Sequence, residues 1–189
     1  MATLSYAALM SLDGFIEDTE GEFDWAMPDA EVHGFANDLD RPISTHLYGR
    51  RMYETMAVWE TVVDGPGVHA AEVEYAELWR SHDKVVYSTT LETVSTSRTR
   101  LEREFDPAAV AHLKETADGD ISVSGPGLAQ HAFRAGLVDD VHLFLFPILV
   151  GGGKPGLPRD IRLDLELVDE HRFANGVVHL HYRTRTTKP

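Results

Sequence analysis

The residues best suited to chemistry in this chain are two glycines, Gly125 and Gly127, which follow a short apolar run. Pro126 stands between them, and its fixed φ suits the first turn of a helix. A helix N-terminus offers unpaired N–H groups and partial positive charge, and glycine lets a phosphate oxygen approach closely. The third glycine of the dinucleotide-binding fingerprint is absent, so an ordinary tight turn is the alternative. We interpret the segment that ends at Leu128 as a phosphate-binding turn.

An arginine pair, Arg50 and Arg51, forms a second candidate anion site because it follows Gly49 at the predicted start of a helix. Guanidinium groups match phosphate oxygens in geometry. Arginine at the positive end of a helix is mildly unfavourable unless an anion lies nearby. The alternative is a surface pair in which the arginines form ion pairs with Glu54 or Asp40.

Two small hydroxyl side chains, Ser88 and Thr89, follow a third predicted strand at 84–87. Such residues end many strands, so this segment indicates little by itself. Ligands of open α/β sheets bind outside the carboxyl ends of the strands. Three strand ends that carry phosphate- or ribose-binding groups therefore predict one ligand site.

Carboxylates that could serve as acid or base are Asp13 in the first loop, Asp24 beside Trp25, and Glu31 in a first helical turn. Glu31 precedes Val32 and borders the core-facing stripe of its helix, so it could reach into a cleft. The alternative is that Glu31 only stabilises its helix, because the helix dipole favours a carboxylate in a first turn.

The histidines predict no metal site. His179 and His181 share a strand face and His142 lies on another strand, but no H-E-x-x-H pattern occurs. We interpret these three side chains as solvated on the sheet face. Segment 151–154 lacks the Ser or Thr of a P-loop, and Pro155 blocks a following helix, so we expect a flexible turn.

The composition excludes several classes of protein. Lys and Arg number 17 against 31 Asp and Glu, a formal charge of −14, so we expect no binding to nucleic acids or membranes. The absence of cysteine excludes disulfides and cysteine nucleophiles. No signal peptide and no apolar run of about 18 residues occurs, which predicts a cytoplasmic location. Its 189 residues predict one globular domain over 1–189.

Strands and helices alternate along most of the chain, and a hairpin around an Asn-Gly turn at 175–176 ends it. This order predicts an α/β fold with a mostly parallel central sheet, helices on both faces and an antiparallel edge. The expected strands lie near 4–10, 45–48, 84–87, 99–102, 120–124, 141–150, 163–167 and 178–182. The expected helices lie near 29–39, 50–56, 70–81 and 126–135, and a further helix begins at Pro107.

Four segments, taken in order, resemble the dihydrofolate-reductase-like superfamily, and more closely the stand-alone relatives of the RibD C-terminal domain family of riboflavin biosynthesis. These segments are 11–16, 48–54, 123–128 and 147–153. The resemblance implies a three-layer dihydrofolate-reductase-like fold, a homodimer, and NADPH bound across the strand ends.

Carried onto this chain, the resemblance implies which residues contact cofactor and substrate. Glu31 and Asp13 would be the catalytic carboxylates, and Phe15 and Trp25 would contact the substrate, with the loop at 13–15 over the nicotinamide. The cofactor-binding residues would be Gly49, Arg50, Arg51, Met52, Ser88, Thr89, Gly125, Pro126, Gly127 and Leu128.

The function expected from this resemblance is an NADPH-dependent reductase that transfers hydride to a pyrimidine- or pterin-like heterocycle. The type would be that of 5-amino-6-(5-phosphoribosylamino)uracil reductase, and the partner a small heterocyclic molecule. A dihydrofolate reductase is the alternative enzyme. A nucleotide-binding module without catalysis is the alternative from another class.

Overall fold

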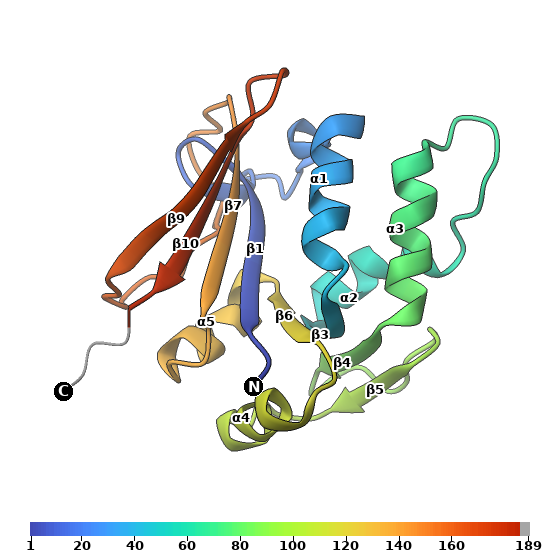
Figure 1. Ribbon diagram of the computed structural model, residues 1–189, viewed down its shortest axis with the longest axis vertical. Coiled ribbons are helices and arrows are strands. Elements are labelled where there is room, and N and C mark those ends of the chain that lie inside the picture. The colour runs from blue at the N-terminus through green and yellow to red at the C-terminus, as the bar shows by residue number, and fades with distance from the viewer. Residues whose placement is uncertain (186–189) are drawn as a thin grey trace.

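The computed structural model describes residues 1–185 as an eight-stranded sheet flanked by five α-helices (Figure 1). The strand order is β5-β4-β3-β6-β1-β7-β10-β9. The strands of this sheet are β1 (Leu4–Ser11), β3 (Ile43–Gly49), β4 (Asp83–Tyr87), β5 (Thr99–Glu102), β6 (Asp120–Ser124), β7 (Asp140–Phe146), β9 (Leu165–Arg172) and β10 (Val178–Thr184). The helices are α1 (Ala30–Asp40), α2 (Arg50–Met56), α3 (Ala70–Ser81), α4 (Pro107–Thr116) and α5 (Pro126–Arg134), with 3-10 turns η1 (Asp24–Ala26) and η2 (Ala57–Glu60).

The sheet is parallel from β5 to β7 and antiparallel at its other edge. β1 pairs in parallel with β6 and β7, and β3 pairs in parallel with β4 and β6. β10 runs antiparallel to both β7 and β9. The expected fold class, a mostly parallel sheet with an antiparallel C-terminal hairpin, is therefore confirmed.

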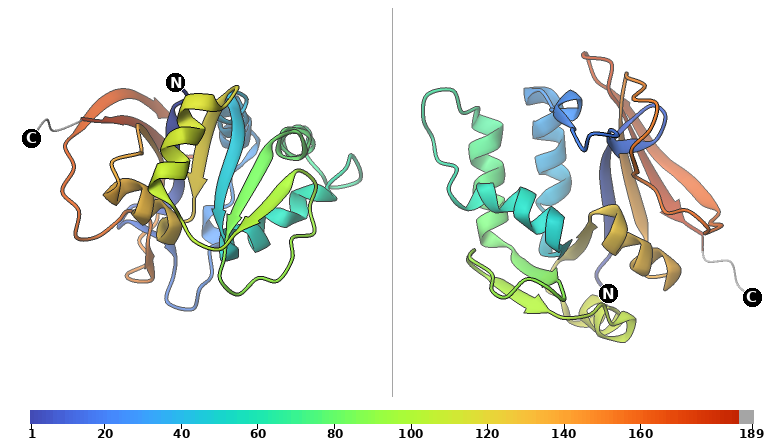
Figure 2. Two further views of the ribbon diagram at one scale, coloured as in Figure 1. Left: turned by 90° about the horizontal axis from the view of Figure 1, so that it is seen from below. Right: turned by 180° about the vertical axis from the view of Figure 1, so that it is seen from behind.

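Helices cover both faces of the sheet (Figure 2). Two neighbouring residues of β4 illustrate this cover. Val85 packs in the apolar cluster with α4 and α5, and Val86 packs in the cluster with Trp79 of α3. Successive side chains of a strand point to opposite faces, so a strand covered on both sides is apolar at consecutive positions.

The helices begin in two different ways. Asp29 caps α1 by accepting from the Val32 N–H at 3.0 Å, and Asp106 caps α4 by accepting from the Ala108 N–H at 2.9 Å. The Glu72 carboxylate of α3 accepts from the His69 N–H at 2.7 Å. In contrast, α2 and α5 begin after a glycine with no side-chain cap. A first helical turn without a cap leaves N–H groups free for a ligand.

Two expectations for segment 141–155 are wrong. The strand ends at Phe146 because Pro147 has no N–H to continue the ladder. The expected flexible turn is instead held against the first loop, where β8 (Lys154–Pro155) pairs with β2 (Phe15–Glu17). A Cβ at Gly153 would lie 2.0 Å from the Glu17 carbonyl oxygen, so only glycine fits there.

The histidines of β7 and β10 are not solvated as expected, because α1 covers this face of the sheet. His179 is buried, and its ring centroid lies 4.8 Å from that of Phe35 in α1. His142 and His181 are partly buried and stacked 4.3 Å apart. Among residues 1–185, no helix is long and apolar enough to span a membrane.

Candidate functional site

The segments that the sequence analysis selected lie at one edge of the sheet. The adjacent parallel strands β4, β3, β6, β1 and β7 all end at this carboxyl edge. Ser88, Gly49, Gly125, Leu12 and Pro147 are the residues that end or follow these strands. The topology thus brings five loops together that are far apart in the sequence. We call the loops after β4, β3 and β6 the phosphate side, and those after β1 and β7 the carboxylate side.

On the phosphate side, the starts of α2 and α5 pack against each other. A Cβ at Gly49 would lie 3.7 Å from the Leu128 Cβ, and one at Gly125 would lie 3.3 Å from the Met52 Cβ. Gly125 also has a φ of +87°, which disfavours any side chain. These four residues therefore bring the two uncapped helix starts together.

Gly127 differs from Gly125 because nothing in the structure requires a glycine there. A Cβ at this position would meet no atom within 4 Å, and the residue has no positive φ. No side chain caps α5, so the N–H groups of Gly127 and Leu128 have no side-chain acceptor. Open space beside free N–H donors fits a phosphate group.

The two arginines have different surroundings, although both are exposed. Arg50 donates from Nε to Glu54 at 2.7 Å and from Nη1 to the Thr90 hydroxyl at 2.9 Å. Within residues 1–185, the Arg51 guanidinium has no ion pair or hydrogen bond. The surface-pair alternative therefore holds for Arg50 with Glu54 and is wrong for Arg51.

Ser88 shapes the loop after β4. It is buried, and its hydroxyl oxygen accepts from the N–H groups of Thr90 at 3.2 Å and Leu91 at 3.0 Å, while Thr89 is exposed. Arg103 stabilises this loop by donating hydrogen bonds to the carbonyl oxygens of Ser88 and Leu91. The sequence analysis missed Arg103, since no motif marks an isolated arginine after a strand.

On the carboxylate side, Asp13 joins the first loop to the loop after β7. It accepts from the Gly151 N–H at 2.8 Å and the Val150 N–H at 3.2 Å. A hydrogen bond with Ser11 is the main cause that lowers the pKa of Asp13, and these two backbone donors lower it further. Asp13 is therefore ionised at neutral pH and serves here as an acceptor.

Glu31 contacts the C-terminal hairpin. Its Oε2 atom accepts from the Ala174 N–H at 3.2 Å, and the side chain is exposed. Glu31 also lies in the first turn of α1, as the helix-dipole alternative expects, whereas Asp29 is the residue whose side chain caps the helix. Ala174 precedes Gly176, whose Cβ would lie 3.6 Å from Pro147, so the hairpin turn borders the loop after β7.

The two residues expected to contact substrate also lie near these loops. Phe15 begins β2, is partly buried, and donates its N–H to the Ser11 hydroxyl oxygen at 3.0 Å. Trp25 packs against the apolar cluster of Val32 and Phe144. Its indole N–H is buried without a hydrogen-bond partner among residues 1–185. A buried donor of this kind is unusual and could be satisfied by a ligand acceptor.

Comparisons with known proteins agree with this architecture. A family model for the RibD C-terminal domain matches residues 2–179. The uncharacterized protein YyaP of Bacillus subtilis (strain 168) is 32% identical over 176 residues, which are 92% of this chain and 90% of that protein.

Solved structures share the fold at lower identity. A putative riboflavin biosynthesis protein from Shewanella sp. PV-4 superposes with a TM-score of 0.74 at 22% identity, covering 98% of this chain and 99% of the other. A pyrimidine reductase-like protein from Corynebacterium diphtheriae gives 0.69 at 15%, covering 97% and 92%. A deaminase/5-amino-6-(5-phosphoribosylamino)uracil reductase from Thermotoga maritima gives 0.68 at 15%, covering 97% of this chain but 57% of that longer one. The chain therefore belongs to the RibD C-terminal domain family.

Proposed function

We propose that this chain is an NADPH-dependent reductase of the riboflavin-biosynthesis type that acts on a pyrimidine- or pterin-like heterocycle. The family is one of reductases, which supports an oxidoreductase activity. The assignment of NADPH as cofactor rests on the geometry of the phosphate side. Two helices begin there without side-chain caps, beside Arg51, which is unpaired within residues 1–185, and beside the open space at Gly127.

In this proposal the phosphate side binds the cofactor, which supplies the hydride when bound. The free N–H groups of Gly127 and Leu128 hold the pyrophosphate, beside Gly125 and Pro126. Arg50 and Arg51 provide the positive charge for the phosphates, next to Gly49 at the start of α2. Ser88 and Thr89 contact the 2′-phosphate and ribose of the adenosine.

The carboxylate side binds the heterocycle and handles its proton. Asp13 keeps the first loop in place over the reacting ring through its contacts with Val150 and Gly151. Its ionised state suits this role better than proton donation. Glu31 relays or stabilises the substrate proton, and Phe15 and Trp25 orient the ring.

We also propose that the protein is a homodimer that pairs through β9. Every residue of this edge strand is exposed, including Leu165, Leu167 and Val168, which are 40, 47 and 44% exposed. An exposed apolar edge strand is a surface that a second chain can cover. Light scattering after size exclusion should give the dimer mass for the wild type and the monomer mass for Leu167→Lys; a monomeric wild type would contradict the proposal.

The proposed reaction is tested by NADPH oxidation with two substrates, 5-amino-6-(5-phosphoribosylamino)uracil and dihydrofolate. Turnover of the pyrimidine supports the proposal, and turnover of dihydrofolate alone would favour a dihydrofolate reductase. Tight NADPH binding without turnover of either substrate would favour a nucleotide-binding module. Absence of NADPH binding at millimolar concentration would contradict the proposal.

A further inference from the structure

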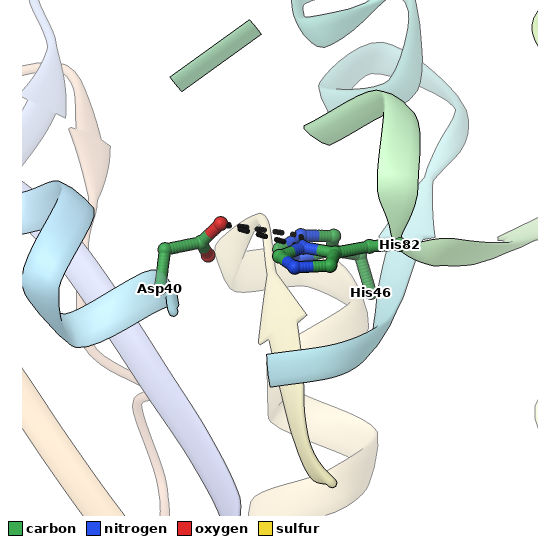
Figure 3. Close-up of side chains that lie close together, drawn as sticks. All are labelled: Asp40, His46 and His82. Atoms are coloured by element: carbon green, nitrogen blue, oxygen red, sulfur yellow. Dashed lines mark hydrogen bonds and ion pairs between the residues drawn. The ribbon is translucent and has the colours of Figure 1, made fainter. Parts of the chain in front are cut away.

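A buried polar cluster of Asp40, His46 and His82 lies toward the amino ends of β3 and β4, opposite the carboxyl edge (Figure 3). Asp40 ends α1, His46 lies within β3, and His82 connects α3 to β4. His46 and His82 are only 2 and 6% exposed. The proposed reductase function uses none of these three side chains.

The three side chains place their ligand atoms at the spacing of a metal site. His46 Nε2 lies 3.0 Å from His82 Nδ1, and Asp40 Oδ2 lies 3.7 Å from the first nitrogen and 3.5 Å from the second. Ligand atoms around a tetrahedral zinc ion at about 2.0–2.1 Å are about 3.4 Å apart. The cluster therefore already has the shape of one triangular face of such a site.

Asp40 provides a second, independent indication. Its Oδ2 atom is buried and has no hydrogen-bond partner among residues 1–185, which is costly for a carboxylate. Asp40 also stands at the negative end of α1, which has no basic residue in its last turn. A carboxylate is disfavoured at this end of a helix, and a cation beside it would offset both costs.

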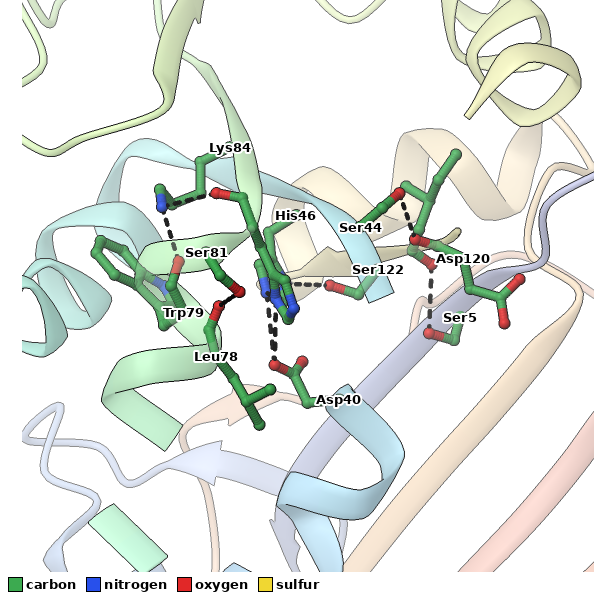
Figure 4. A network of polar contacts seen from close by, with 12 residues as sticks. Ser5, Asp40, Ser44, His46, Leu78, Trp79, Ser81, Lys84, Asp120 and Ser122 are labelled. Carbon is green, nitrogen blue, oxygen red and sulfur yellow. Dashed lines mark hydrogen bonds and ion pairs between the residues drawn. The ribbon is translucent and has the colours of Figure 1, made fainter. Parts of the chain in front are cut away.

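The surroundings of His46 accommodate the tautomer that a metal requires, in which Nδ1 carries the proton and a metal ion replaces the hydrogen bond between His46 Nε2 and His82 Nδ1. His46 Nδ1 lies 2.6 Å from the Ser122 hydroxyl (Figure 4). Metal-bound histidines usually donate their second ring N–H to an oxygen, which fixes the ring and leaves the other nitrogen as a ligand.

The nearest buried cation does not take the place of a metal. Lys84 donates from Nζ to the backbone carbonyl oxygens of Trp79 at 2.8 Å and of His82 at 2.9 Å. These bonds occupy the end of α3 and leave the ring of His82 free to face Asp40 (Figure 3).

We propose that Asp40, His46 and His82 bind one divalent transition-metal ion of the zinc class, with water completing its coordination. Two histidines and a carboxylate are a ligand set that zinc accepts in proteins. The formal charge of −14 also favours a bound cation. The ion links the end of α1 to β3 and to the end of α3, so its role is to stabilise this part of the fold.

The proposal is tested by zinc titration of the full chain after its metals are removed with a chelator. We expect calorimetry to show one zinc ion bound per chain, with a dissociation constant of about 10 µM or lower. Asp40→Asn and His82→Gln should each weaken binding by at least ~10-fold. Zinc should raise the melting temperature of the wild type, and Co²⁺ should give the intense visible bands of a tetrahedral site.

The matched control is His181→Gln, which alters the other histidine cluster, where His181 contacts Asp140 at 2.8 Å. This variant should keep full zinc affinity. Zinc binding weaker than about 100 µM would overturn the proposal, as would binding that His181→Gln removes or that Asp40→Asn and His82→Gln leave intact. Circular dichroism without metal checks the fold of each variant. If Asp40→Asn and His82→Gln do not fold, weak Co²⁺ bands of the octahedral type in the wild type would overturn the proposal.

Discussion

The two sides of the carboxyl edge differ in how their polar groups are paired. Within residues 1–185, the phosphate side has an arginine and the first N–H groups of two helices without partners. On the carboxylate side, Asp13 and Glu31 both accept hydrogen bonds from backbone N–H groups. Among these described residues, the Arg51 guanidinium has no ion pair or hydrogen bond and the Gly127 N–H has no side-chain acceptor. In contrast, Asp13 accepts from Val150 and Gly151, and Glu31 accepts from Ala174. Unpaired donors indicate a ligand directly. Carboxylates that already stabilise loops indicate one only indirectly, so the two sides call for different tests.

The largest effect is expected from Gly127→Val. The new side chain fits the free protein, because a Cβ there meets nothing within 4 Å. It would fill the space of the pyrophosphate, so we expect at least ~100-fold weaker NADPH binding, equal to about 2.7 kcal/mol, at a nearly unchanged melting temperature.

Gly125→Ala is the matched control for that substitution. Its φ of +87° and the close Met52 Cβ predict a loss of stability of about 1–2 kcal/mol. A folded Gly127→Val variant with full NADPH affinity would show that the pyrophosphate lies elsewhere.

The second prediction separates the two arginines. We expect NADPH to bind at least ~10-fold tighter than NADH, a difference of about 1.4 kcal/mol. Arg51→Ala should remove most of this preference and its salt dependence. Arg50→Ala should have a smaller effect, since Arg50 is already paired with Glu54. Fluorescence titrations with NADPH and NADH measure the two affinities. Equal affinities in the wild type would contradict the proposal that the arginines select the phosphorylated cofactor.

The third prediction concerns the carboxylate side. Glu31→Gln should lower kcat about fivefold with unchanged NADPH affinity, less than for a buried acid, because water reaches the exposed Glu31 and can also supply protons. Asp13→Asn should instead raise KM by loosening the first loop. Unchanged turnover for Glu31→Gln would assign Glu31 to the hairpin contact alone and favour Asp13 as the reacting carboxylate.

The fourth prediction concerns a pH dependence of stability, which lies away from the site. Burial, the main cause, lowers the pKa of His142 and of His179 to about 4. Because protons bind more readily to these rings in the unfolded chain, their contribution to stability is lost as pH falls from about 6.5 to 4. Burial raises the pKa of Asp40 to about 7, which acts in the opposite sense, so a variant must isolate the effect.

The informative variant is His142→Gln, compared with the wild type by chemical unfolding at pH 7.5 and 5.0. The wild type should lose more stability between these two conditions, by on the order of 1–2 kcal/mol. Identical losses would show that these histidines do not carry the pH dependence.

Features that lie within one short segment were predictable from the sequence. The turns that begin α2 and α5 are examples, because a strand, a glycine and a helix start are local patterns. The partners of Asp13 and Glu31 were not predictable, since Gly151 and Ala174 follow them by 138 and 143 residues. The contact between Phe35 and His179 was not predictable either, because it depends on how α1 packs against the sheet. The cluster of Asp40, His46 and His82 has no motif spacing at all.

The central claim, that the phosphate side binds a dinucleotide, is tested most directly by NMR titration of ¹⁵N-labelled protein with NADPH. The account predicts that the amide signals of Gly127 and Leu128 shift most, followed by that of Arg51. The amide of Ala174, already bonded to Glu31, should shift less. Saturable NADPH binding that leaves the Gly127 and Leu128 amides unmoved would contradict the account.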